Sequence, residues 1–224
     1  LYEFRYVRKA EPEKVGIALL LGGAVHDAIG AEAQRRLEGK EGGLNYALTA
    51  FRQMLTCKVE LPEAPVDLGD KGLIEHMEVG EGLIRAYFNH GPVEKLLAVE
   101  KEFELDLGEG LKLAGVIDFV VQGGDGPEVV ELKTSARSWS QLQAELSPQG
   151  GIYAMALGEG KRGVPVTYRV LGKTKVPKVQ ELRLVHPPEG RERISEVAQD
   201  VRCNLETGAF PRNEGVQTCS ACSY

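Results

Sequence analysis

Three charged residues interrupt a stretch of the chain that is otherwise built from valine, isoleucine and leucine. Asp118 comes before a Gly-Gly-Asp-Gly-Pro cluster at 123–127, and Glu131 and Lys133 come after it. Because apolar, β-branched runs flank the cluster, the sequence predicts a β-hairpin that carries all three charges. Glu131 and Lys133 are two residues apart and therefore point to the same face of their strand.

Two carboxylates and one ammonium group on a strand face suit metal-assisted hydrolysis. The acids hold a hard divalent cation through oxygen ligands, while the lysine orients water and neutralises developing charge. General acid–base assistance alone is worth about 10²–10⁴-fold, and phosphate-ester hydrolysis needs many more orders of magnitude. The alternative is a solvated Glu-Lys strand edge with one buried aspartate in a turn network. Since an unpaired charge on an apolar face is costly, a metal ion or another partner is expected.

The elements that position these residues follow from the hydrophobic pattern. Apolar side chains recur every fourth residue between Ile17 and Leu37, which is typical of one face of a helix. Ser147-Pro148 predicts the start of a helix that runs to about Leu157. Further helices are expected at 44–55, 70–90 and 189–206, and strands at 96–107, 111–121, 128–133, 164–171 and 179–185. This order predicts an α/β fold: a mixed central sheet flanked by helices, with an N-terminal helical region.

Length and composition set limits on the function. The chain has 224 residues, which suits one domain with a helical elaboration. Its net charge of −6 argues against a simple basic nucleic-acid-binding module. No apolar run reaches the ~20 residues of a membrane span, and no signal peptide is present, so a cytoplasmic protein is expected. The first residue is Leu1 rather than Met, and a Cys-x-x-Cys pair lies at the other end, so we expect a fragment.

Asp118 followed by Glu131-Leu132-Lys133 resembles the core motif of the PD-(D/E)XK nuclease superfamily, with Ile117 where the family name has proline. A histidine after a Gly-Gly helical turn, His26, and a downstream Gln149-x-x-x-Tyr153 are similar to the additional motifs of its RecB-like branch. That branch includes nuclease domains of helicase–nuclease recombination complexes and CRISPR-associated exonucleases. The resemblance implies a restriction-endonuclease-like fold over residues 1–224, with a helical region at about 1–92, a nuclease core at 93–208 and a cysteine-containing tail at 209–224.

The resemblance also implies roles for the matching residues. His26, Asp118, Glu131 and the Leu132 carbonyl would bind Mg²⁺ or Mn²⁺, and Lys133 would position the attacking water. Gln149 and Tyr153 would contact DNA or steady the lysine. Without the resemblance, a lone histidine in such a helix, like His26, is more often a packed or surface residue. Gln149 and Tyr153 would then form a helix pair that closes over the sheet. Glu100, on the strand before the hairpin, is either an acid that supports the metal ligands without binding the metal or an edge-strand glutamate.

The four cysteines divide into two groups. The resemblance implies that Cys219 and Cys222 are two ligands of a 4Fe–4S cluster whose remaining ligands lie outside the fragment. A redox Cys-x-x-Cys pair and a zinc knuckle are the alternatives. Cys57 and Cys203 fall in predicted helices, where we expect them to behave as small buried residues.

Two hypotheses about function follow. The first is a metal-dependent DNA exonuclease of repair, recombination or defence that acts on single-stranded or end-containing DNA, alone or with a helicase. Several basic residues near loops would line part of the DNA path, among them Arg35, Arg137 and Lys173. The second is a catalytically inactive subunit that binds DNA ends or serves as a scaffold. The intact set of Asp118, Glu131 and Lys133 favours the enzyme.

Overall fold

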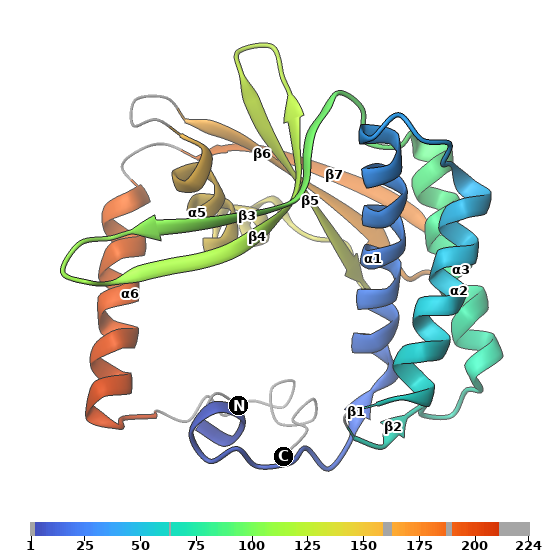
Figure 1. The fold of residues 1–224 in the computed structure, drawn as a ribbon, viewed down its shortest axis with the longest axis horizontal. Coiled ribbons are helices and arrows are strands. Elements are labelled where there is room, and N and C mark those ends of the chain that lie inside the picture. The colour runs from blue at the N-terminus through green and yellow to red at the C-terminus, as the bar shows by residue number, and fades with distance from the viewer. Residues whose placement is uncertain (1–2, 63, 159–162, 187–189, 211–224) are drawn as a thin grey trace.

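Five strands form one mixed sheet at the centre of the molecule (Figure 1). The computed structural model describes residues 3–62, 64–158, 163–186 and 190–210. The strands lie in the order of the chain, and only β5 and β6 are parallel neighbours. Their bounds are β3 Leu96–Asp106, β4 Lys112–Gln122, β5 Pro127–Ser135, β6 Val164–Gly172 and β7 Lys178–His186. The predicted hairpin is therefore β4–β5, at the middle of the sheet.

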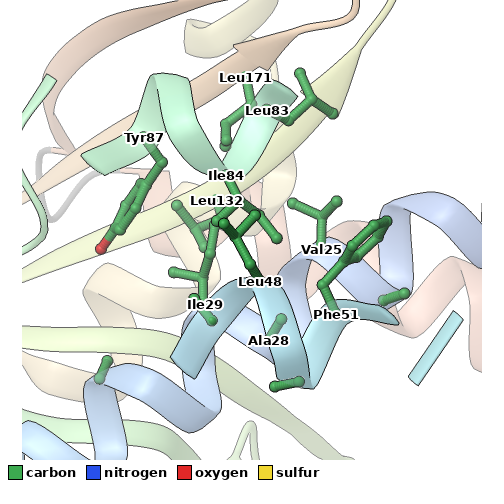
Figure 2. Close-up of a cluster of buried hydrophobic side chains, with 14 of the residues drawn as sticks. Val25, Ala28, Ile29, Leu48, Phe51, Leu83, Ile84, Tyr87, Leu132 and Leu171 are labelled. Atoms are coloured by element: carbon green, nitrogen blue, oxygen red, sulfur yellow. The ribbon is translucent and has the colours of Figure 1, made fainter. Parts of the chain in front are cut away.

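Three helices from the first part of the chain pack together against one face of the sheet (Figure 1). They are α1 (Ile17–Leu37), α2 (Leu44–Glu60) and α3 (Leu73–His90). On α1, the predicted stripe of Val25, Ile29 and Ala33 is fully buried, whereas Leu37 at its end is exposed. Figure 2 shows side chains of all three helices meeting Leu132 and Leu171 of the sheet. This apolar contact fixes α1 relative to β5, the strand that carries Glu131 and Lys133.

The opposite face of the sheet is covered by the crossover between the two parallel strands. A parallel pair cannot be joined by a tight turn, so the chain passes over the sheet through helices. These are α4 (Gln141–Glu145) and α5 (Pro148–Leu157), and α5 begins at the proline that the sequence predicted. Tyr153 and Ala154 of α5 pack on this face with Ile117 and Val166. The last helix, α6 (Gly190–Thr207), packs against α5.

The structure agrees with the predicted α/β class and differs from the sequence interpretation in detail. It adds a single π-helical turn, Glu3–Val7, and a short parallel pair between β1 (Val15–Gly16) and β2 (Val66–Asp67). None of the helices in the described part of the chain is long and apolar enough to cross a bilayer.

The expectation for two of the cysteines was wrong. Cys57 and Cys203 lie in α2 and α6 as predicted, but both are free and exposed. Cys57 is not on the buried face of α2, which carries Phe51 and Leu55, and α6 turns Ile194 and Val197 rather than Cys203 toward its groove with the rest of the protein. Helical context alone therefore did not indicate burial. Cys219 and Cys222 lie outside the described residues.

Candidate active site

The backbone pairing of β4 with each of its two neighbours, β3 and β5, is interrupted at Asp118. Between Ala98 and Asp106, β3 pairs with β4 at every position except the one where Glu100 faces Asp118. On the other side, β4–β5 pairing ends at Phe119–Val130, one step before Asp118 would face Glu131. We call this point, with Asp118 and Glu131 on its two strands, the fork. Strands that separate leave backbone groups without ladder partners, and those groups must be satisfied in another way.

Two side chains take over the missing backbone partners. The Leu132 amide of β5 donates to Asp118 Oδ2 over 2.8 Å, and the Val116 carbonyl of β4 accepts from the Tyr153 hydroxyl over 2.9 Å. Asp118 and Tyr153 thus hold the two strands apart in a defined geometry. Asp118 also keeps its carboxylate at the fork because this hydrogen bond fixes it there.

Lys133 lies at the centre of a chain of side-chain hydrogen bonds. Its Nζ donates to Glu131 Oε1 and to Gln149 Oε1, each over 2.6 Å. Gln149 Nε2 in turn donates to the Tyr153 hydroxyl over 2.6 Å. The two α5 residues are one helical turn apart, which places both side chains over the same strand. The lysine is therefore fixed from its own strand and from the crossover helix.

His26 reaches the fork from α1, on the other face of the sheet. Its Nδ1 lies 3.6 Å from Asp118 Oδ2. The helix comes this close because one turn earlier it carries glycine: a Cβ atom on Gly22 would lie 2.9 Å from Thr134 Oγ1 of β5. The first glycine of the Gly-Gly turn therefore allows a close approach of helix to strand.

Burial and neighbouring charges shift the acid–base properties of the site. Burial, followed by the negative charge of Asp118, raises the pKa of Glu131 to about 7, although Lys133 acts in the opposite direction. Burial also lowers the pKa of His26, an effect that Asp118 opposes. The Glu131 side chain is 3% exposed, and its Oε2 has no hydrogen-bond partner among the described residues. A buried carboxylate with one free oxygen beside a second acid is a site that attracts positive charge.

The comparisons with known proteins agree with this geometry. A model of the PD-(D/E)XK nuclease superfamily matches residues 1–224. The chain belongs to this superfamily. No curated protein sequence is similar enough to count as a match. The predicted recognition is confirmed at the level of the superfamily, and assignment to the RecB-like branch stays a prediction.

One solved structure shows the same fold, and a second is less similar. A crystal structure described as "Putative exonuclease" from Eubacterium rectale has a TM-score of 0.51 and 12% sequence identity, and covers 98% of this chain and 92% of that chain. A protein named SSO0001 has a TM-score of 0.38 and 14% identity, and covers 84% of this chain and 76% of that chain. The first similarity confirms the restriction-endonuclease-like fold expected from the sequence.

The side chains at the fork are of the chemical types that bind a divalent cation. Mg²⁺ and Mn²⁺ prefer oxygen ligands, and this PD-(D/E)XK site offers two carboxylates and one buried oxygen without a partner. Among the described residues, however, no three His, Cys, Asp or Glu side chains already converge as a cation site. The structure pairs His26 with Asp118 and Glu131 with Lys133. The metal roles of these residues, and of the Leu132 carbonyl, stay predictions.

Sequence reasoning missed the contacts that hold the fork open. It did not identify the Val116 carbonyl or the Leu132 amide, because every residue type carries these backbone groups. It left three roles open for Gln149 and Tyr153: DNA contact, support of the lysine, or a helix pair that closes over the sheet. The structure shows Gln149 bonded to Lys133 and to Tyr153, and Tyr153 packed on the sheet. A tyrosine four residues after a glutamine was the signal that found them.

Proposed function

We propose that this PD-(D/E)XK protein is a divalent-cation-dependent DNA exonuclease of the RecB-like branch. Its substrate would be single-stranded or end-containing DNA, and its context would be repair, recombination or defence, alone or with a helicase. The observation that carries the proposal is the hydrogen-bonded chain from Glu131 through Lys133 and Gln149 to Tyr153, next to Asp118 at the open fork. The proximity of His26 to Asp118 supports the RecB-like branch, because a histidine on a preceding helix distinguishes it.

Lys133 has the position that a water-orienting lysine needs. An ammonium group has three donors, and Glu131 and Gln149 accept from it here. These two contacts leave one donor, which would serve the attacking water or a phosphoryl oxygen. The lysine side chain is 25% exposed, so this donor is accessible to a bound strand.

The reaction is hydrolysis of one phosphodiester bond. The oxygen of water forms a bond to phosphorus, the bond from phosphorus to the leaving sugar oxygen breaks in line, and the proton of the water is passed on so that the leaving oxygen ends as a hydroxyl. Asp118, Glu131 and His26 would hold Mg²⁺ or Mn²⁺, which when bound stabilises negative charge on the phosphoryl oxygens. Lys133 adds a fixed positive charge beside the same oxygens.

The decisive experiment is cleavage of end-labelled DNA in Mg²⁺ by the wild type and by Lys133→Met. Methionine keeps the apolar stem of the side chain and removes the ammonium group. Lys112→Met is the matched control, because Lys112 is exposed and pairs with Glu104 on the β3–β4 hairpin, away from the fork. We expect degradation of linear DNA, resistance of closed circular DNA, loss of cleavage in Lys133→Met and full activity in the control.

Two results would overturn the proposal. Wild-type cleavage by Lys133→Met would show that the fork is not the active site. Tight binding of DNA ends without any cleavage by the folded wild type would favour the inactive end-binding or scaffolding subunit. The 4Fe–4S cluster stays a separate prediction, and broad absorbance near ~400 nm in protein purified without oxygen would test it.

A further inference from the structure

We infer that the protein holds its DNA on one side of the scissile bond, through basic side chains at the end of β5 and at the β6–β7 turn. This inference rests on the proposed function. The side chains are those of Arg137, Lys173, Lys175 and Lys178, which we call the basic end. The part of the substrate that they bind is the strand that remains after each cut.

Beyond the fork, β4 and β5 belong to two different parts of the molecule. Their pairing stops at Phe119 and Val130, so the two strands are free to diverge. The β3–β4 hairpin extends toward α6, whereas β5 ends beside α1, where Thr134 lies against Gly22 (Figure 1). A DNA strand whose scissile bond lies at Lys133 can therefore extend toward the hairpin or toward the end of β5.

The hairpin side does not attract a phosphate backbone. Residues 101–113 contain four acids, all of them exposed, and two lysines. Lys112 is paired with Glu104 over 2.6 Å. Arg202 of α6 donates to the carbonyl of Glu109 at the hairpin turn over 2.9 Å. Because the acids are in excess and these two basic groups already have acceptors, this side repels an anionic strand.

The basic end has the opposite character. In the part of the chain that the structure describes, none of its side chains makes an ion pair or a hydrogen bond. Lys173 is half-buried, and burial lowers the pKa of its ammonium group without a compensating acid. Other basic side chains of the molecule are paired, as Lys14 is with Asp67 and Lys58 with Asp27. A cluster of unpaired positive charge in a chain of net charge −6 is a binding site for an anion.

The basic end begins close to Lys133. Ser135 follows Lys133 by two residues, which is about 7 Å along the same face of β5. The Lys173 amide donates to the Ser135 carbonyl over 2.7 Å, and the Arg137 amide donates to Ser135 Oγ over 3.2 Å. Gly172, which pairs with Ser135, also pairs with Lys178. A strand cut at Lys133 therefore meets these basic residues with the phosphates that follow the scissile one.

This asymmetry suits an enzyme that removes nucleotides from an end. The strand that remains carries many phosphates and stays bound through counterion release at the basic end. The released product is short and lies toward the acidic hairpin, where no comparable attraction retains it. Binding on one side thus favours repeated cuts from one terminus.

The experiment compares steady-state cleavage of single-stranded DNA by the wild type and by the double variant Arg137→Gln/Lys173→Gln. We expect KM to rise at least about tenfold, since each substitution removes a charged hydrogen-bond donor to a phosphate, while kcat stays near wild type. The dependence of log(kcat/KM) on log[salt] should become shallower by about 0.7 for each charge removed. Lys112→Gln is the matched control, because it removes one positive charge on the hairpin side, and it should change neither quantity.

Strand length gives a second readout. An exonuclease cuts near one terminus, so added nucleotides extend only the strand that remains. In the wild type, KM should fall as the strand is lengthened nucleotide by nucleotide, and in the double variant this fall should be much smaller. Arg137→Gln alone should show an intermediate effect, and because Arg137 is exposed this variant should melt as the wild type does.

Three results would overturn the inference. They are an unchanged KM and salt dependence in the double variant, an equal loss in Lys112→Gln, and a lower kcat at unchanged KM, which would place the basic residues in the chemical step. In each of them the wild type cleaves DNA, so the proposed function stands. A folded wild-type chain that does not cleave DNA in Mg²⁺ or Mn²⁺ would instead overturn the proposed function.

Discussion

Two buried glutamates in this molecule each pair with a basic side chain, and their surroundings differ. Glu32 is 0% exposed, and its Oε1 accepts from Arg36 Nε over 2.8 Å and from the Gly43 amide over 3.0 Å. Glu131 is 2% exposed, and its Oε1 accepts from Lys133 over 2.6 Å. Each has one further oxygen without a partner among the described residues. Burial and ion pairing alone do not distinguish them.

The neighbours of the two pairs distinguish them. Arg36 also donates to the Val93 carbonyl, so the Glu32–Arg36 pair connects α1 with the chain before α2 and with the chain before β3. No second acid takes part in these contacts. Glu131 lies beside Asp118, whose charge opposes its ionisation, at a point where the backbone ladders are open. The buried charge of Glu32 therefore connects segments of the structure. The buried charge of Glu131 instead lies beside a second acid, where the backbone pairing of the strands is interrupted.

The largest expected difference between the two regions is in activity. Glu131→Gln keeps the size of the side chain and removes its charge, and should lower the DNA cleavage rate by about 10³-fold or more, because cation binding and the alignment of Lys133 both depend on the carboxylate. Glu32→Gln should stay within a few-fold of wild type. Initial rates on labelled DNA, measured well below each melting temperature, test this. Equal losses in the two variants would remove the distinction.

The pH dependence of stability should also identify the fork. The pKa of Glu131 is raised from 4.5 to about 7 in the folded protein, so between these values the folded chain holds a proton that the unfolded chain has released. Stability of the metal-free protein should therefore fall as pH rises through this window, by about 2–3 kcal/mol from this residue. Urea denaturation from pH 4.5 to 8 measures the slope, and Glu131→Gln should flatten it. An unchanged slope in that variant would show that another group titrates.

The sequence predicted the order of helices and strands along the chain in detail. It predicted which residue types matter at the fork, but not how the strands are arranged there. Apolar periodicity places Val25, Ile29 and Ala33 in the core, because burial of a helix face depends mainly on local spacing. The break in pairing at Asp118 depends on contacts with Leu132 and with α5, which are distant in sequence, so local patterns could not predict it. The role of Glu32 was missed for a similar reason, since its partners include backbone atoms of other segments.

The Glu32–Arg36 pair should contribute more to stability than to chemistry. Glu32→Gln leaves the Arg36 guanidinium without its charged acceptor and should lower the free energy of unfolding by about 2 kcal/mol. Arg36→Lys should cost a similar amount, because lysine cannot reach both Glu32 and the Val93 carbonyl with one planar group. Urea unfolding at pH 7 measures both. Glu131→Gln is the comparison, and it should leave the metal-free protein as stable as wild type or more so. A destabilised Glu131→Gln would reverse the assignment of the two regions.

The smallest expected effect concerns Tyr153 at the edge of the fork. Tyr153→Phe removes the donor to the Val116 carbonyl and the acceptor for Gln149, so it should cost about 1 kcal/mol of stability and lower the cleavage rate about tenfold through a less restrained Lys133. Tyr168→Phe is a close control for the rate: Tyr168 faces Glu131 across β5–β6 and is fully buried, but its hydroxyl lies near Ser147 and Gly150, away from Lys133. That substitution should leave the cleavage rate near wild type. If the two variants behave alike, the hydroxyl of Tyr153 does not hold the fork, and the lysine is positioned by Glu131 and Gln149 alone.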